Sequence, residues 1–251
     1  MLRAPRLRKA SGDLTLARMT VQILHGWGEL MAAFAAFFLS HALPARPALK
    51  ARLVAVLGRA GYGVAFSLLS TGLLYWLIVA TGRAPYVELW PPALWQRWTV
   101  NIVMPLVVLL GTFGVAAPNP FAFEGKAKGF DPAHPGIAGV TRQPLLWAML
   151  LWSLAHLLAN GDLAHGLMFG AFAALAALGM KLVEARRARA MGAEEWARLT
   201  AHTGLLPLAA LFDGRWKPQA LPSALRLGLA VAIWWSFLEL HAPLIGLSPL
   251  P

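Results

Sequence analysis

The chain has 251 residues, of which 58% are hydrophobic and only 13% are charged, with a mean hydropathy of +0.59. A soluble domain carries about 25% charged residues, so this composition excludes an ordinary soluble protein and predicts an all-α, polytopic membrane helical bundle. The lack of cysteine excludes disulfides and thiolate metal sites. The net charge of +11 does not indicate a nucleic-acid partner, because the basic residues lie between apolar runs, where they set topology and contact anionic lipid.

Apolar runs in chain order predict about six membrane-spanning helices. We expect a basic tail over residues 1–18 and a single transmembrane domain over residues 19–251. The six predicted spans are residues 20–42, 61–81, 98–117, 144–159, 163–180 and 224–247. Between the first two spans, residues 44–59 form a basic, amphipathic segment that we expect to lie in the membrane interface.

Two connections are too long to be plain turns. Residues 118–142 are dense in proline and glycine, and their length suggests a lid. Residues 181–215 are charged, and we expect a helix over residues 184–200. The arginines of this helix lie beside Trp196, which suggests docking on the membrane surface; a solvated connector is the alternative.

The lysines and arginines are distributed unequally between the two membrane sides. With six spans, 15 of them fall on the side of residues 118–142 and 181–226, and 7 fall on the side of the two termini. The positive-inside rule then places the first of these sides in the cytoplasm and both termini on the opposite side of the membrane.

Ionisable residues inside predicted spans are rare and usually functional. The run TRQPLLWAMLLWSLAHLLANGD (141–162) places His156 inside an apolar helix, near the turn Asn160-Gly161. On the same membrane side, the topology places five further groups: His25, Glu29, His165, Glu239 and His241. His41 alone lies near the opposite side. This convergence predicts a cofactor site, although single histidines can also bond to a neighbouring carbonyl.

The central run, together with GLMFGAF (166–172), SHALPARP (40–47) and LPLAALFDGR (206–215), resembles the NnrU family of bacterial inner-membrane proteins over residues 30–215. The pattern is also similar to the plastid cis-zeta-carotene isomerase, which uses haem b, and distantly to isoprenylcysteine methyltransferases. The resemblance implies His156 and His41 as axial haem ligands. His165 and Arg142 are further candidates for binding the cofactor.

Three features of the chain depart from that expectation. The family usually reads Arg-His-Pro where this chain has Gln143 before Pro144, and the isomerase's thiol position is Ser153. In addition, His41 lies about five residues from its membrane boundary, whereas His156 lies fourteen from the same boundary. The difference is an offset of roughly 13 Å along the membrane normal, so His165 or His25 could instead be the partner of His156.

The resemblance implies a haem-binding membrane protein that supports nitrite and nitric oxide reduction together with denitrification components, or that assists a reaction such as cis-trans isomerisation of a lipophilic substrate. One alternative is a methyltransferase using S-adenosylmethionine, bound by Arg142, the 118–142 loop and the Glu194-Glu195 helix. Another is a non-catalytic assembly protein. The sequence does not decide whether the protein is an enzyme.

Overall fold

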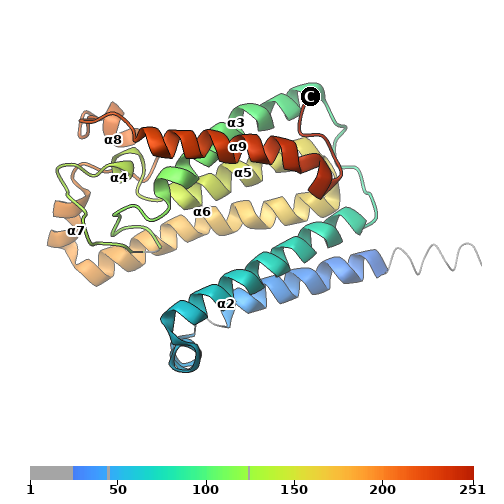
Figure 1. Ribbon diagram of the computed structural model, residues 1–251, viewed down its shortest axis with the longest axis horizontal. Helices are drawn as coiled ribbons and strands as arrows, with labels where there is room; N and C mark the ends of the chain where they lie inside the picture. The colour runs from blue at the N-terminus through green and yellow to red at the C-terminus, as the bar shows by residue number, and fades with distance from the viewer. Residues whose placement is uncertain (1–24, 44–45, 124) are drawn as a thin grey trace, which may run out of the picture. The chain divides into compact units, whose positions relative to one another are not determined.

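A computed structural model describes residues 25–43, 46–123 and 125–251 (Figure 1). The predicted basic tail (1–18), the start of the first span and Pro44 lie outside the described residues. Helices dominate the rest, and the described residues form isolated β-bridges but no strands. The prediction of an all-α membrane protein is confirmed.

The long helices correspond to the six predicted spans. They are residues 25–42, α2 (Pro47–Arg83), α3 (Leu94–Gly114), α5 (Pro144–Asn160), α6 (Leu163–Met191) and α9 (Ala224–Ile245). Among the described residues, α2, α3, α6 and α9 are long and apolar enough to cross a membrane, and α5 is apolar but shorter. The protein is therefore a multi-pass membrane protein. Short helices lie between these spans: α4 (Ile137–Val140), α7 (Ala193–Thr200) and α8 (Ala209–Phe212).

The chain divides into two compact units. The first comprises residues 1–89 and Asp162–His165, and the second comprises Trp90–Gly161 and Gly166–Pro251. In the described part of the first unit, residues 25–42 pair antiparallel with α2. Buried Leu30, Ala33 and Phe37 recur at helical spacing on one face of this helix. Across the pair, the Glu29 carboxylate accepts hydrogen bonds from Trp76 and Arg83.

Helix α2 combines two predicted elements. Gly58 has φ +70° and ψ 167°, which breaks the helix between the predicted interfacial segment and the second span. Glycine adopts this backbone conformation without the steric cost that a side chain would bring. The ammonium group of Lys50 lies 6.0 Å from the ring centroid of Tyr62, across the break. The structure thus confirms the boundary between the two segments.

In the second unit, α3 packs against both α5 and α9 (Figure 1). The end of α3 touches the start of α5 so closely that a Cβ atom on Gly114 would lie 2.9 Å from Cγ of Pro144. At the start of α9, Arg226 donates a hydrogen bond of 2.9 Å to the carbonyl of Phe113. These contacts fix the starts of α5 and α9 at one end of α3.

The charged segment after the fifth span differs from the prediction. Helix α6 continues beyond the predicted span to Met191, and Gly192, with φ +81°, separates it from α7. The predicted helix over residues 184–200 is therefore two helices. Glycine again supplies a positive φ that periodicity alone does not reveal.

Candidate functional site

His156 lies on α5, half-buried between aromatic rings. The centroids of Trp152 and Phe169 lie 5.5 and 5.2 Å from that of the imidazole. Nδ1 donates a hydrogen bond of 2.9 Å to the carbonyl oxygen of Trp152, one helical turn earlier. Because a carbonyl can only accept, Nδ1 carries the proton and Nε2 keeps a free electron pair. A metal-binding histidine has this arrangement, in which a backbone carbonyl fixes the tautomer.

His241 on α9 belongs to the same unit as His156 and has the same tautomer. Its Nδ1 donates a hydrogen bond of 2.7 Å to the carbonyl oxygen of Leu247, which leaves Nε2 with the electron pair. The sequence placed His241 on the same membrane side as His156 without assigning it a role as a ligand.

His41, the other ligand implied by the resemblance, lies in the first unit with both ring nitrogens engaged. Nδ1 is 2.7 Å from the carbonyl oxygen of Phe37, so it donates there. Nε2 is 3.0 Å from Oγ of Ser70 on α2 and therefore accepts from that hydroxyl. The ring also touches Phe66, at a centroid distance of 5.3 Å. To bind iron, Nε2 would have to give up the Ser70 hydroxyl.

His165 is anchored at the start of α6, also in the first unit. Its Nδ1 lies 2.7 Å from Oδ2 of Asp162. The other carboxylate oxygen of Asp162 accepts from the backbone N–H groups of Ala164 and His165, as an N-cap residue does. This geometry gives His165 a role in capping the helix.

The predicted cluster of groups on one membrane side is divided between the units. His25 and Glu29 lie in the first unit, and Glu29 bonds to Arg83, at 3.2 Å, and to Trp76. His25 is exposed. Glu239 is exposed on α9. Within the described part of the chain, no three His, Asp or Glu side chains come together as a metal site.

Arg142, the remaining candidate, forms the centre of a polar cap at the start of α5. We define the polar cap as Arg142, Glu184, Thr203 and the backbone of residues 204–205. The guanidinium forms a two-pronged ion pair with Glu184, with both N–O distances 2.7 Å, and a bond of 3.2 Å to Oγ1 of Thr203. The side chains of Arg142 and Glu184 are only 14% and 15% exposed. Arg142 therefore has partners within the protein itself.

The polar cap is reinforced by the segment that follows α7. The backbone N–H of Arg142 donates to the carbonyl of Gly204, at 2.8 Å. Thr141 and Trp147 both donate to the carbonyl of Leu205, at 2.7 and 2.9 Å. Sequence reasoning missed Glu184 as a partner, although it is the lone acidic residue of the α6 extension, and this could have indicated the pairing.

The 118–142 loop folds against this end of the unit. Asn119 donates to the carbonyl of Arg142 at 2.9 Å, and Arg187 on α6 donates to the carbonyls of Ala122 and Phe123. The ring of Trp196 packs edge-on against Phe121, at 5.5 Å, and beneath the Arg142 guanidinium. Trp196, which the sequence suggested for membrane docking, thus contacts the protein itself.

Gln143, where the family pattern has histidine, is 1% exposed. Its Nε2 donates to the carbonyl of Phe121 at 3.0 Å, while Oε1 is buried without a partner among the described residues. The amide nitrogen of the side chain therefore joins the loop to the start of α5, while the amide oxygen forms no hydrogen bond within the described chain.

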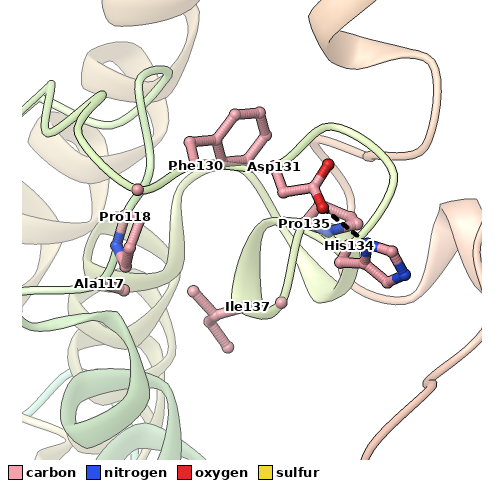
Figure 2. A pocket seen from close by; sticks show the side chains of 9 residues that line it. Ala117, Pro118, Phe130, Asp131, His134, Pro135 and Ile137 are labelled. Carbon is pink, nitrogen blue, oxygen red and sulfur yellow. Dashed lines mark hydrogen bonds and ion pairs between the residues drawn. The ribbon is translucent and has the colours of Figure 1, made fainter.

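A shallow hollow lies beside this loop, with an empty volume of about 300 Å³ that includes open solvent. Figure 2 shows Phe130, Ile137, Pro118 and the Asp131–His134 pair around it. The His134 ring bonds to the Asp131 carboxylate at 2.7 Å and holds the pKa of that carboxyl below its usual range. Ligand pockets begin at about 300 Å³ of enclosed space, so this open hollow is smaller than a typical site for a cofactor.

The Glu194-Glu195 pair, proposed for the methyltransferase alternative, lies on α7. Both Glu195 oxygens bond to Arg198 at 2.7 and 2.8 Å, and this exposed pair lowers the pKa of Glu195 through the hydrogen bonds from Arg198. Glu195 and Arg142 thus both have partners within the protein.

Comparison with known proteins agrees with this architecture and with the resemblance noted above. No curated protein and no solved structure matches the chain. The family model described as "NnrU protein" matches residues 29–249, which include every long helix of the described chain from Glu29 onward. With nearly the whole chain matched, this multi-pass membrane protein belongs to the NnrU family.

Proposed function

We propose that the protein binds haem b in the second unit, where the imidazole of His156 would hold the iron. The main support is the tautomer of His156, because the hydrogen bond to the Trp152 carbonyl leaves Nε2 able to bind a metal. The described residues offer no cluster of three ligands for a bare ion. Haem supplies four equatorial nitrogens itself, and thus needs only one or two protein ligands.

The residues around His156 also suit such a group. Trp152 and Phe169 lie against the imidazole and pack edge-on against each other at 5.2 Å, and Phe172 packs against Trp152 at 5.8 Å. An apolar shell excludes water and tunes the potential of a bound iron. When bound, haem would supply one-electron chemistry; the protein's own residues would position it and exclude water.

For the biological role, we propose support of nitrite or nitric oxide reduction in a bacterial inner membrane, to which membership of the NnrU family lends support. Haem-assisted isomerisation of a lipophilic substrate is a second role that the same site would serve. In the proposed orientation both termini are periplasmic, and the polar cap faces the cytoplasm. Reporter fusions at the C-terminus test this orientation, and a cytoplasmic signal would refute it.

The decisive experiment is an absorption spectrum of the detergent-purified protein from haem-replete cells, oxidised and then reduced. We expect a reducible Soret band in the wild type and its loss in His156→Ala, with unchanged recovery from membranes. The matched control is His134→Ala, because His134 lies in the 118–142 loop and is exposed. A wild-type protein without haem would overturn the proposal.

A further inference from the structure

One axial ligand leaves open what binds the opposite face of the haem. His41, the partner implied by the resemblance, uses both ring nitrogens in its own unit, on the Phe37 carbonyl and the Ser70 hydroxyl. His165 is tied to the Asp162 carboxylate at 2.7 Å. His41 would have to give up the bond from Ser70 before its Nε2 could act as a ligand, and His165 lies in the first unit, beside the Asp162 carboxylate that caps α6.

His241 has neither obstacle. Its Nδ1–H donates to the carbonyl of Leu247, just as Nδ1–H of His156 donates to Trp152. Among the described residues, no donor forms a hydrogen bond with Nε2 of either ring. The second unit therefore contains two half-buried imidazoles, both in the tautomer that binds iron through Nε2.

The topology brings these two rings to the same end of the unit. Helices α5 and α9 both pack against α3 and run in the same direction (Figure 1). His156 lies four residues before Asn160, the last residue of α5, and His241 lies four residues before Ile245, the last residue of α9. Helical bundles hold planar cofactors between such helices, with a ligand from each side.

A third observation comes from the same face of α9. Trp234 lies seven residues, or about two turns, before His241, so the two side chains share one face of the helix. The indole Nε1 of Trp234 is buried and has no hydrogen-bond partner among the described residues. A buried N–H without an acceptor is costly, and a carboxylate of a bound porphyrin is the class of acceptor that would satisfy it.

We propose that His241 of α9 is the second axial ligand of the haem bound by His156. This inference rests on the proposed function and deepens it, because it places the complete ligand pair in the second unit. His41 then has a structural role, holding residues 25–42 against α2 through Ser70.

The test compares spin states in the purified, haem-loaded protein. With two imidazole ligands, the wild-type ferric haem is six-coordinate and low-spin, and we expect His241→Ala to retain haem in a five-coordinate, high-spin form. Added imidazole should restore the low-spin spectrum of this variant. The matched controls are Glu239→Ala, an exposed neighbour on α9, and His41→Ala; both should remain low-spin.

A low-spin spectrum that survives His241→Ala but is lost in His41→Ala would overturn this inference and leave the proposed function intact. Wild-type protein without haem would overturn both. Should His241→Ala fail to fold, His241→Met supplies a thioether ligand, for which we expect a low-spin haem with a raised reduction potential. An unchanged potential would contradict the assignment.

Because the chain has no cysteine, proximity can also be tested without haem. A His156→Cys, His241→Cys double variant should be crosslinked by a short bifunctional thiol reagent. The control pair His156→Cys, Ser236→Cys should not react, since Ser236 lies five residues before His241 and therefore on a different face of α9. Absence of crosslinking in the first pair would contradict the placement of the two rings at one end of the unit.

Discussion

The two ends of α5 use polar groups in opposite ways. At its start, nearly every donor of Arg142 has a partner in the polar cap, and the ion pair with Glu184 is shielded from solvent. Near its other end, His156 makes one hydrogen bond, to its own helix, and its second nitrogen is left free. The same apolar helix therefore has one end that is saturated internally and one that retains binding capacity.

This difference separates residues that hold the fold from residues available for chemistry. A buried charge without a partner is strongly unfavourable, so the pairing of Arg142 is a condition of its burial. A neutral imidazole is less costly to bury, and one satisfied nitrogen is enough to orient it. The comparison thus assigns Arg142 to stability and leaves His156 with one ring nitrogen that forms no hydrogen bond within the described chain.

The largest expected effect comes from breaking the polar cap. Arg142→Ala leaves the Glu184 carboxylate buried without a counter-charge, which should lower the free energy of unfolding by about 3–5 kcal/mol. His156→Ala should change it far less. Thermal unfolding in detergent, followed by tryptophan fluorescence, measures both. The control is Arg198→Ala, which removes a solvent-exposed pair and should have little effect. If Arg142→Ala and His156→Ala lowered the free energy of unfolding equally, the two ends of α5 would not differ in their contribution to stability.

A smaller effect is expected at Trp196. Trp196→Asp removes the edge-on contact with Phe121 and the cation–π contact with Arg142, for a loss of about 2 kcal/mol. Limited proteolysis in membranes should then cut more rapidly within residues 193–216. Ala197→Asp is the control, because Ala197 is exposed on the same helix. Equal protection of Trp196→Asp and wild type would show that α7 does not depend on this contact.

Gln143 tests whether a second buried polar side chain at the start of α5 contributes as much to stability as Arg142 does. Gln143→Leu removes a hydrogen bond to Phe121 but also removes the buried oxygen that has no partner, so the two effects oppose each other. We expect the free energy of unfolding to change by less than about 1 kcal/mol. Chemical denaturation measures it. A loss as large as that of Arg142→Ala would mean that Gln143 also belongs to the polar cap.

The smallest effect concerns pH and the hollow beside the 118–142 loop. The hydrogen bond from His134, followed by that from the Ala133 N–H, lowers the pKa of Asp131 in the folded protein. The stabilisation is therefore fully present above the unfolded pKa of about 4 and is lost as the pH falls through the lower folded value. The protection factors of the amides in residues 129–137, which correct for the intrinsic exchange rate at each pH, should fall in acid, and Asp131→Asn should flatten that dependence. If the pH profile of Asp131→Asn matched that of the wild type, the pH dependence would come from another titratable group.

The spans could be predicted from the sequence because apolar length is a strong, local signal. The turn at Asn160-Gly161 was also predictable from its turn residues, and the break between residues 44–59 and the second span from the change from a basic, amphipathic pattern to an apolar one. The break at Gly192 was missed, because periodicity continues across it. Turn residues thus locate breaks only where the hydrophobic pattern also changes.

The candidate site was only partly predictable. Apolar flanks singled out His156, but its tautomer depends on the Trp152 carbonyl, and the partners of Arg142 and His41 come from other helices, 42 and 29 residues away. Such pairings follow from tertiary packing, which no local pattern encodes. Similarly, the free Nε2 of His241 becomes visible only once the Leu247 carbonyl is placed beside its ring.

The length of α5 has a consequence for how molecules reach His156. Its 17 residues span roughly 25 Å, whereas a bilayer core is about 30 Å thick. With the charged polar cap held at one boundary of the bilayer core, the shortfall falls at the Asn160 end, and His156 lies only about 6 Å, or one turn, before that end. From the Arg142 side, the same ring lies behind roughly 20 Å of apolar helix. Protons and small polar molecules would thus enter from one side of the membrane, which gives the site a fixed direction of access.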